Sequence, residues 1–378
     1  MLASLESPSG KPGLVTRINA ATPPGRDRAV DALRALAILG VVLGHWLVTA
    51  FVTAGDGTEL RVTSPLKQMP EITPISWVLQ TLAVFFLVGG YTAAKGNRPG
   101  EPWVRRRVAR LLRPVPALLL AWVPATAVLL WAGFSAGTAR VLVKLVLSPL
   151  WFLVVYGALT ALAPLIIAFW RRAGLWGVAV PVAVTAGIDL ARFGFEGPAW
   201  LGWGTVLTGW LVPFYLGIAW ADGALGSRRA AASMLAGGAA ATAALVLFAG
   251  YPASMVGVPG AEVSNLNPPT LAAVAFGVAQ VGLALLLRDR LEGWMRRPRA
   301  WAAVALANLS AMTVFLWHQT AMMFVTVGVF VLAGPMPGLH SRPGDLGWAV
   351  DRLCWLPVFV AALAGLWALA HRFERPRR

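Results

Sequence analysis

The stretch 27–47, DRAVDALRALAILGVVLGHWL, decides the class of fold to which this chain belongs. It is largely apolar, and an α-helix needs about 20 apolar residues to cross a bilayer. Comparable runs recur along the chain, near 32–52, 75–94, 114–133, 150–170, 174–191, 200–220, 231–250, 269–287, 302–333 and 349–370. The sequence therefore predicts an all-α integral membrane protein of about ten transmembrane helices.

The composition agrees with this prediction. Hydrophobic residues make up 58% of the 378 residues and charged residues 13%, whereas a soluble domain is about a quarter charged. We expect a disordered cytoplasmic tail at 1–29, a membrane domain at 30–371 and a basic cytoplasmic tail at 372–378. The first segment lacks the apolar core of roughly 7–15 residues that a signal peptide needs. The apolar stretch 134–149, which holds two cations, is expected to be re-entrant or interfacial.

The basic residues predict the orientation. With the N-terminus inside, 24 of the 32 lysines and arginines fall in cytoplasmic segments and 7 on the other side. This asymmetry follows the positive-inside rule and places both termini in the cytoplasm. The net charge of +16 therefore reflects membrane orientation, and no nucleic-acid partner is expected. A composition rich in Ala, Arg, Gly and Trp suggests a high-GC bacterium, so we expect the bacterial cytoplasmic (inner) membrane.

Ionisable residues within a membrane helix are costly and are therefore candidates for function. The first span carries Asp31, Arg34 and His45. Arg34 and His45 are eleven residues apart, which is about three helical turns, so they share one face and lie roughly 16 Å apart. Histidine is the side chain best suited to move a proton near neutral pH. The alternative is that Arg34 anchors the inner end of the helix and His45 makes an interhelical contact.

A second candidate is the basic segment after the second span, WVRRRVARLLRPVPALLL. Arg107, Arg110 and Arg113 are spaced by three and would share a helical face. Such a cluster suits phosphate binding, but taken alone it is better explained as an orientation signal. A third candidate is His318, which contacts substrate or makes a buried hydrogen bond with Asn308 or Ser310.

The remaining histidines, the single cysteine and the absence of known motifs add little evidence for a particular function. His340 and His371 are expected to be incidental, and the single cysteine, Cys354, is expected to be a small buried apolar residue. No Walker A, HExxH or GxSxG motif occurs, so neither an ATPase nor a zinc or serine hydrolase is signalled. We expect no metal.

Several segments, in order, resemble the acyltransferase-3 family of membrane-bound bacterial acyltransferases. They are DRAVDALRALAILGVVLGHW, AVFFLVGGYTAAK, RRRVARLLRPVP, SPLWFLVVYGALTALAPL, NLSAMTVFLWHQ and HRFERP. Gly89 stands where the family commonly has Ser, and Phe315 where Tyr is common. The chain resembles the stand-alone type, which has no hydrolase-like domain after the last helix.

The resemblance implies transfer of an acyl group, often acetyl, from acyl-CoA to a hydroxyl of a sugar, glycan or glycosylated metabolite. It implies that His45 is the catalytic base and that Arg34 matches an essential arginine. Arg107 and Arg110 match a pair proposed to hold the acyl-CoA, and we add Arg113 to this set. The candidate substrate contacts are Asp31, Trp151, Asn308, Ser310 and His318. The expected partners are the bilayer, acyl-CoA and a hydroxyl-bearing acceptor.

Two other classes of function remain open on the sequence. One is a proton-coupled transporter of an anionic or glycosylated metabolite, with His45 as proton relay and Arg34 as anion contact. The other is a membrane scaffold without catalysis. Consumption of a thioester distinguishes the enzyme from both.

Overall fold

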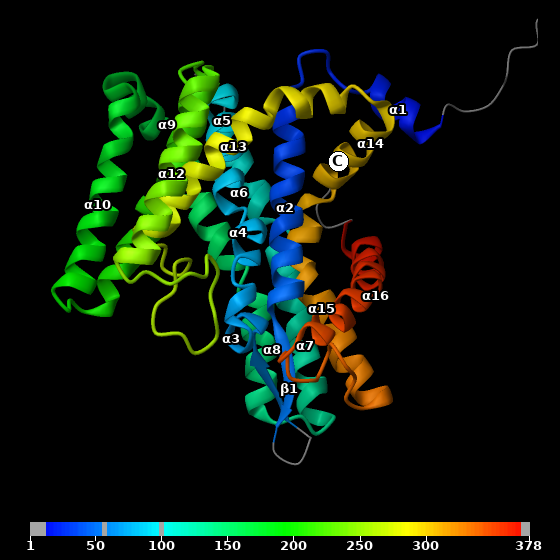
Figure 1. The fold of residues 1–378 in the computed structure, drawn as a ribbon. Helices are drawn as coiled ribbons and strands as arrows, with labels where there is room; N and C mark the ends of the chain where they lie inside the picture. The colour runs from blue at the N-terminus through cyan, green and yellow to red at the C-terminus, as the bar shows by residue number, and fades with distance from the viewer. Residues whose placement is uncertain (1–12, 55–58, 98–101, 372–378) are drawn as a thin grey trace, which may run out of the picture.

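The computed structural model describes residues 13–54, 59–97 and 102–371. It is an all-helical membrane bundle with one short hairpin (Figure 1). Helix α2 runs vertically through the middle of the view, and α1 lies at the upper right. The hairpin strand β1 lies at the foot of the molecule, beyond the lower end of α2.

The first half of the described chain contains both strands and the first nine helices. Its elements are α1 (Leu14–Ala20), α2 (Arg28–Val48), β1 (Ala50–Ala54), β2 (Glu59–Thr63), α3 (Pro65–Gln68), η1 (Pro70–Ile72), α4 (Ile75–Leu79), α5 (Leu82–Gly96), α6 (Trp103–Leu112), α7 (Val115–Trp131), α8 (Ala136–Leu147) and α9 (Leu150–Ala173). The strands pair antiparallel, with Ala50 opposite Thr63.

The second half is helical throughout its regular structure. Its elements are η2 (Gly174–Val178), α10 (Ala179–Asp189), the single π-helical turn η3 (Leu190–Gly194), η4 (Ala199–Gly204), α11 (Thr205–Ala221), α12 (Arg228–Phe248), α13 (Leu271–Met295), α14 (Pro298–Leu309), α15 (Ala311–Ala333) and α16 (Leu346–Ala370). In Figure 1, α9, α10 and α12 lie on one side of α2, and α15 and α16 on the other.

Nine helical stretches in the described residues are long and apolar enough to cross a membrane. One of them, Ala136–Gly194, contains the separate helices α8, α9 and α10. The prediction of a multi-pass, all-α membrane protein is therefore confirmed. Large apolar side chains point outward along these stretches, among them Leu120, Val123 and Phe248, as expected for helices that face lipid.

Helices α5 and α11 pack closely because both carry glycine at their contact. A methyl group at Gly90 would overlap the carbonyl oxygen of Phe214, and one at Gly217 would overlap that of Leu87. Small residues allow helix backbones to approach in this way within membranes. This packing fixes the position of α5, which lines the site described below.

The structure differs from the sequence expectations at the N-terminal end. Residues 14–20 of the predicted disordered tail form helix α1, and α2 begins at Arg28. The side-chain amide of Asn19 donates to the carbonyl oxygen of Pro298 (3.2 Å), and Trp301 donates to the Thr22 hydroxyl (2.7 Å). These contacts with α14 order the segment, and they join residues about 280 positions apart. The predicted tail at 372–378 lies outside the described residues.

Three of the predicted spans have other boundaries in the structure. The first ends at Val48, and the residues that follow form the hairpin. The second is interrupted between α4 and α5, where the Thr81 hydroxyl donates to the carbonyl oxygen of Ala37 (2.7 Å). The ninth is divided at Ser310 into α14 and α15. Polar groups from neighbouring helices satisfy such breaks in a membrane protein.

Three residues have surroundings that the sequence did not indicate. Cys354, expected to be buried, is exposed on α16. Arg352, counted among outer-side charges, is fully buried and donates to the carbonyl oxygens of Trp46 (2.7 Å) and Thr49 (2.8 Å). His340, expected to be incidental, is buried and lies 2.8 Å from the carbonyl oxygen of Thr326. Arg352 therefore links α16 to the lower end of α2, and His340 links the loop before α16 to α15.

Candidate functional site

A cavity of about 1240 Å³ opens around the first turns of α2. Its walls come from the segment before α2 and from α2, α5, α6, α9, α13, α14 and α15. Small-molecule sites in proteins are usually about 300–1,000 Å³. The cavity is therefore large enough for a bulky ligand.

Cations outnumber anions in the walls of this cavity. The cationic residues are Arg26, Arg34, Lys95, Arg107, Arg110 and Arg288, and the acidic residues are Asp27, Asp31 and Glu292. This excess favours an anionic ligand.

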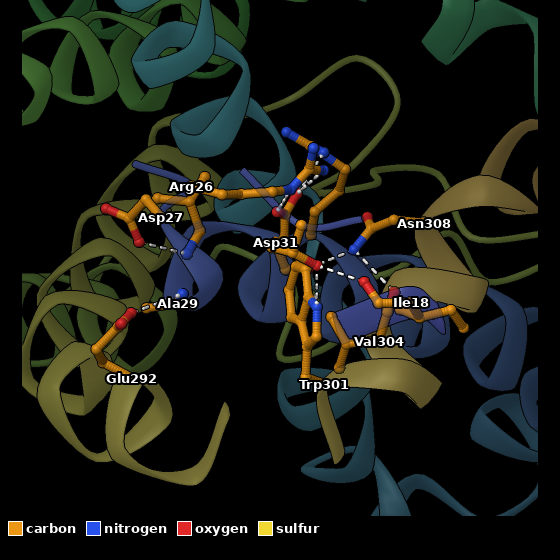
Figure 2. A network of polar contacts seen from close by, with 12 residues as sticks. Ile18, Arg26, Asp27, Ala29, Asp31, Glu292, Trp301, Val304 and Asn308 are labelled. Atoms are coloured by element: carbon orange, nitrogen blue, oxygen red, sulfur yellow. Dashed lines mark hydrogen bonds and ion pairs between the residues drawn. The ribbon is translucent and has the colours of Figure 1, made fainter. Parts of the chain in front are cut away.

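Asp31 lies at the centre of a hydrogen-bonded network (Figure 2). Its buried carboxylate accepts hydrogen bonds from Arg26 Nε (2.6 Å) and from Arg34 Nη1 (3.0 Å). Its backbone carbonyl oxygen accepts one from the side-chain amide of Asn308 (2.8 Å). Asp31 therefore fixes Arg34 on the cavity wall and joins α2 to α14.

The other two carboxylates are also engaged. Asp27 caps α2 by accepting from the backbone N–H of Val30 (3.1 Å), and its second oxygen accepts from Tyr91 (3.1 Å) and Arg288 (3.2 Å). Glu292 accepts from the backbone N–H of Ala29 (3.2 Å). All three acidic groups thus hold the start of α2, and Asp27 and Asp31 are each already paired with arginine.

The side chains of Arg107 and Arg110 are free to bind a ligand. Within the described part of the chain, neither side chain makes a hydrogen bond or ion pair, and both side chains line the cavity. They project from α6, as their spacing of three residues predicts. Arg113 ends the same helix but does not line the cavity.

His45 lies near the other end of α2, outside the lining of the cavity. Its Nδ1 is 2.9 Å from the side-chain amide nitrogen of Gln319, and its ring centroid is 5.1 Å from that of His318. His318 is fully buried, with Nδ1 2.7 Å from the carbonyl oxygen of Phe315. His318 therefore does not bond to Asn308 or Ser310, the partners expected from the sequence.

A continuous group of aromatic rings lies between the cavity and the histidines. Phe85 and Tyr156 line the cavity, and both pack on Phe152, at 5.0 and 5.8 Å between centroids. Phe152 packs on Phe315 (5.2 Å), which lies 6.1 Å from His318. The region between the cavity and the histidines is therefore lined largely by aromatic rings.

Seven of the ten predicted site residues thus fall into two groups. Five of them, Asp31, Arg34, Arg107, Arg110 and Asn308, meet in the cavity. His45 and His318 form a separate pair deeper in the bundle. Trp151 lies in the aromatic group, 6.3 Å from Phe152, and Ser310 lies at the break between α14 and α15.

The sequence reasoning missed Gln319 and four cavity residues, Arg26, Lys95, Tyr156 and Arg288. Gln319 directly follows His318, but nothing in the sequence shows that it faces a residue 274 positions away. Arg26, Lys95 and Arg288 were counted only as orientation signals. Clusters of cations near helix ends can orient a membrane protein or bind an anionic ligand, so charge alone does not distinguish these two roles.

Among the described residues, no group of three or more His, Cys, Asp or Glu side chains is arranged to hold a metal ion.

A family model described as an acyltransferase domain, the acyltransferase-3 family, matches residues 27–371. The match covers every helix of the structure from α2 to α16, including both groups of candidate site residues. No curated protein and no solved structure gives a match.

Proposed function

Because the chain belongs to the acyltransferase-3 family and is a membrane acyltransferase, we propose that it transfers an acyl group from acyl-CoA to a hydroxyl group. The acyl group is acetyl, and the acceptor is a sugar, a glycan or a glycosylated metabolite. The observation that carries this proposal is the cationic cavity around Arg34, Arg107 and Arg110.

The cavity suits the donor on three grounds. Its size accommodates a nucleotide with a long arm, and its cations complement the phosphates of CoA. Arginine binds phosphate through a planar, bidentate arrangement of donors, and Arg107 and Arg110 have no hydrogen bond or ion pair within the described residues. The cavity also opens at the end of α2 that charge asymmetry predicts to be cytoplasmic, where CoA occurs.

His45 is the proposed general base. It lies on the same helix as Arg34, roughly 16 Å further along the axis, so the pantetheine arm of the donor would extend along α2 past the aromatic rings. The imidazole removes the proton of the acceptor hydroxyl while its oxygen attacks the thioester carbonyl carbon. The C–S bond breaks, the thiolate of CoA takes the proton back from His45, and the ester leaves. A positioned base contributes about 10²- to 10⁴-fold to such a step.

The test is acceptor-dependent release of free CoA from acetyl-CoA. Purified protein in nanodiscs is supplied with a set of sugar and glycoside acceptors, with wild type beside His45→Ala. We expect release only with a suitable acceptor, and none above background in the variant. The variant should unfold at a moderately lower temperature and remain folded under assay conditions, because it loses one side-chain hydrogen bond, to the buried Gln319.

The opposite result would favour a transporter over an enzyme. Release that is absent with every acceptor, or equal in the variant, would contradict the proposal. The transporter alternative would then be tested by flux of anionic glycosides into proteoliposomes, with and without a proton gradient.

A further inference from the structure

The contact between His45 and Gln319 has a chemical consequence beyond packing. Gln319 is fully buried on α15, and its amide nitrogen lies 2.9 Å from His45 Nδ1. Its amide oxygen is buried and has no hydrogen-bond partner among the described residues. A glutamine amide offers either its NH₂ group or its oxygen to the same neighbour after half a turn about its last side-chain bond.

The two orientations fix two different forms of a neutral His45. If the NH₂ group donates to Nδ1, the ring proton is on Nε2, and Nε2 has no lone pair to accept a proton. If the oxygen accepts from Nδ1–H, the lone pair is on Nε2. Because Gln319 covers Nδ1, Nε2 is the nitrogen left to meet a substrate.

We propose that Gln319 is a positioning residue that presents its amide oxygen to His45 Nδ1–H and so keeps the lone pair on Nε2. This inference rests on the proposed role of His45 as the base. It adds the residue that enables the imidazole to accept a proton. Other catalytic histidines are likewise oriented by a group bonded to the ring nitrogen that does not take part in the reaction.

The reaction cycle gives an independent reason for this orientation. After His45 takes the acceptor proton, both of its nitrogens carry hydrogen. An NH₂ group at Nδ1 would then face another donor, whereas the amide oxygen accepts from Nδ1–H before, during and after the transfer. Gln319 therefore stays fixed while the proton moves onto Nε2 from the hydroxyl and off again to the thiolate.

The other histidines provide internal references for a direct test. His318 Nδ1 lies 2.7 Å from the carbonyl oxygen of Phe315, so its proton is on Nδ1. His340 Nδ1 accepts from the backbone N–H of Met336 (3.1 Å), and its Nε2 faces the carbonyl oxygen of Thr326 (2.8 Å), so its proton is on Nε2. The chain thus contains one buried example of each neutral form.

The experiment is ¹⁵N NMR of histidine-labelled full-length protein in lipid bilayers, with the His45 signals assigned by their loss in His45→Ala. We expect His45 to match His318, with a protonated Nδ1 and an unprotonated Nε2. A His45 spectrum that matches His340 would overturn the inference. This readout does not depend on activity, so it stands apart from any failure to detect acyl transfer.

Two variants test the consequence for catalysis. Gln319→Met has similar length but no hydrogen-bonding amide, and we expect kcat to fall about 10- to 100-fold, the cost of removing a group that orients a metal-binding histidine. KM for the acyl donor should not change, because Gln319 does not line the cavity. Gln319→Glu keeps an oxygen acceptor and should recover most of kcat. Wild-type kcat in Gln319→Met, or equal loss in both variants, would contradict the role.

Discussion

At the scale of single residues, the arginines of α6 have two possible roles, to orient the chain in the membrane or to bind the donor. Arg107 and Arg110 line the cavity, whereas Arg113 lies outside it. All three serve equally as orientation signals, since they belong to the same basic segment. Only the first two are therefore expected to contribute to binding of the donor.

We predict that the double variant Arg107→Ala/Arg110→Ala raises KM for acetyl-CoA about 10-fold or more, since a hydrogen bond to a charged group contributes about 1.5–3 kcal/mol. Arg113→Ala is the matched control and should keep the wild-type KM. Steady-state release of CoA at varied acetyl-CoA concentration measures both. An unchanged KM in the double variant would mean that the cluster serves only to orient the chain.

His340 is a second residue whose surroundings lead to a prediction. Burial lowers the pKa of its imidazole from the ordinary value of 6.5, and the nearby Arg352 guanidinium acts in the same direction. Its Nδ1 accepts a hydrogen bond from the backbone N–H of Met336, which a protonated ring would lose. The neutral form therefore stabilises the fold above about pH 6.5, and this contribution is lost as pH falls below that value.

We expect the thermal unfolding temperature in detergent to fall between about pH 7.5 and about pH 5.5, a range that spans the ordinary histidine pKa. His340→Gln offers an amide in place of the imidazole and does not titrate. Its unfolding temperature should fall less over the same range. Parallel curves for the two proteins would show that His340 does not contribute to the acid sensitivity.

At the scale of the elements, the contact between α5 and α11 is set by backbone atoms. A methyl group at Gly90 meets the main chain of Phe214, which cannot turn aside as a side chain can. We predict that Gly90→Ala lowers the unfolding temperature strongly, because the two helices must separate. Gly157→Ala on α9 is the control, since nothing lies within 4 Å of an added methyl there. Equal unfolding temperatures would refute this view of the packing.

Arg352 fixes the position of the lower end of α2 through hydrogen bonds to carbonyl oxygens. The last carbonyls of a helix lack intrahelical partners and carry partial negative charge, which a cation complements. Arg352 binds the carbonyl oxygens of Trp46, Thr49 and Gly338. Arg352→Met should leave these groups buried and unpaired, each at a cost of about 1–3 kcal/mol.

The measurement for this prediction is again the unfolding temperature, with Arg171→Met as control. Arg171 lies on the exposed surface of α9, and its replacement should change stability little. If Arg352→Met matched the control, the carbonyls would have to find other donors, and α2 would not depend on α16 for its position.

At the scale of the whole molecule, the sequence predicted the class of fold because apolar runs and charge asymmetry are local properties. It also identified the cationic segment of α6 and the pair Arg34 and His45, which regular helix geometry relates. It did not predict that residues 14–20 form a helix, that a hairpin follows α2, or that the helix breaks at Ser310. The helix at 14–20 depends on contacts with α14, a segment distant along the chain. The hairpin is a local pairing of two short strands, and the break interrupts a continuous apolar run, so hydropathy did not mark either one.

The site was predictable to the same limited extent. Arg34, Arg107 and Arg110 meet in one cavity, and the sequence proposed them together. Arg26 and Arg288 complete that cavity only because α1, α13 and α14 surround the start of α2. The pairing of His45 with Gln319 joins α2 to α15, and helical periodicity within one segment carries no information about it.

The proposed transfer of an acyl group from CoA to a hydroxyl would change the mass of the acceptor. The most direct measurement is the mass of the acceptor after incubation with acetyl-CoA carrying isotope in its acetyl group, for wild type and His45→Ala in nanodiscs. We expect a labelled acetyl ester on the acceptor with wild type and none with the variant. An unmodified acceptor with wild type, or the same labelled ester with both proteins, would contradict it.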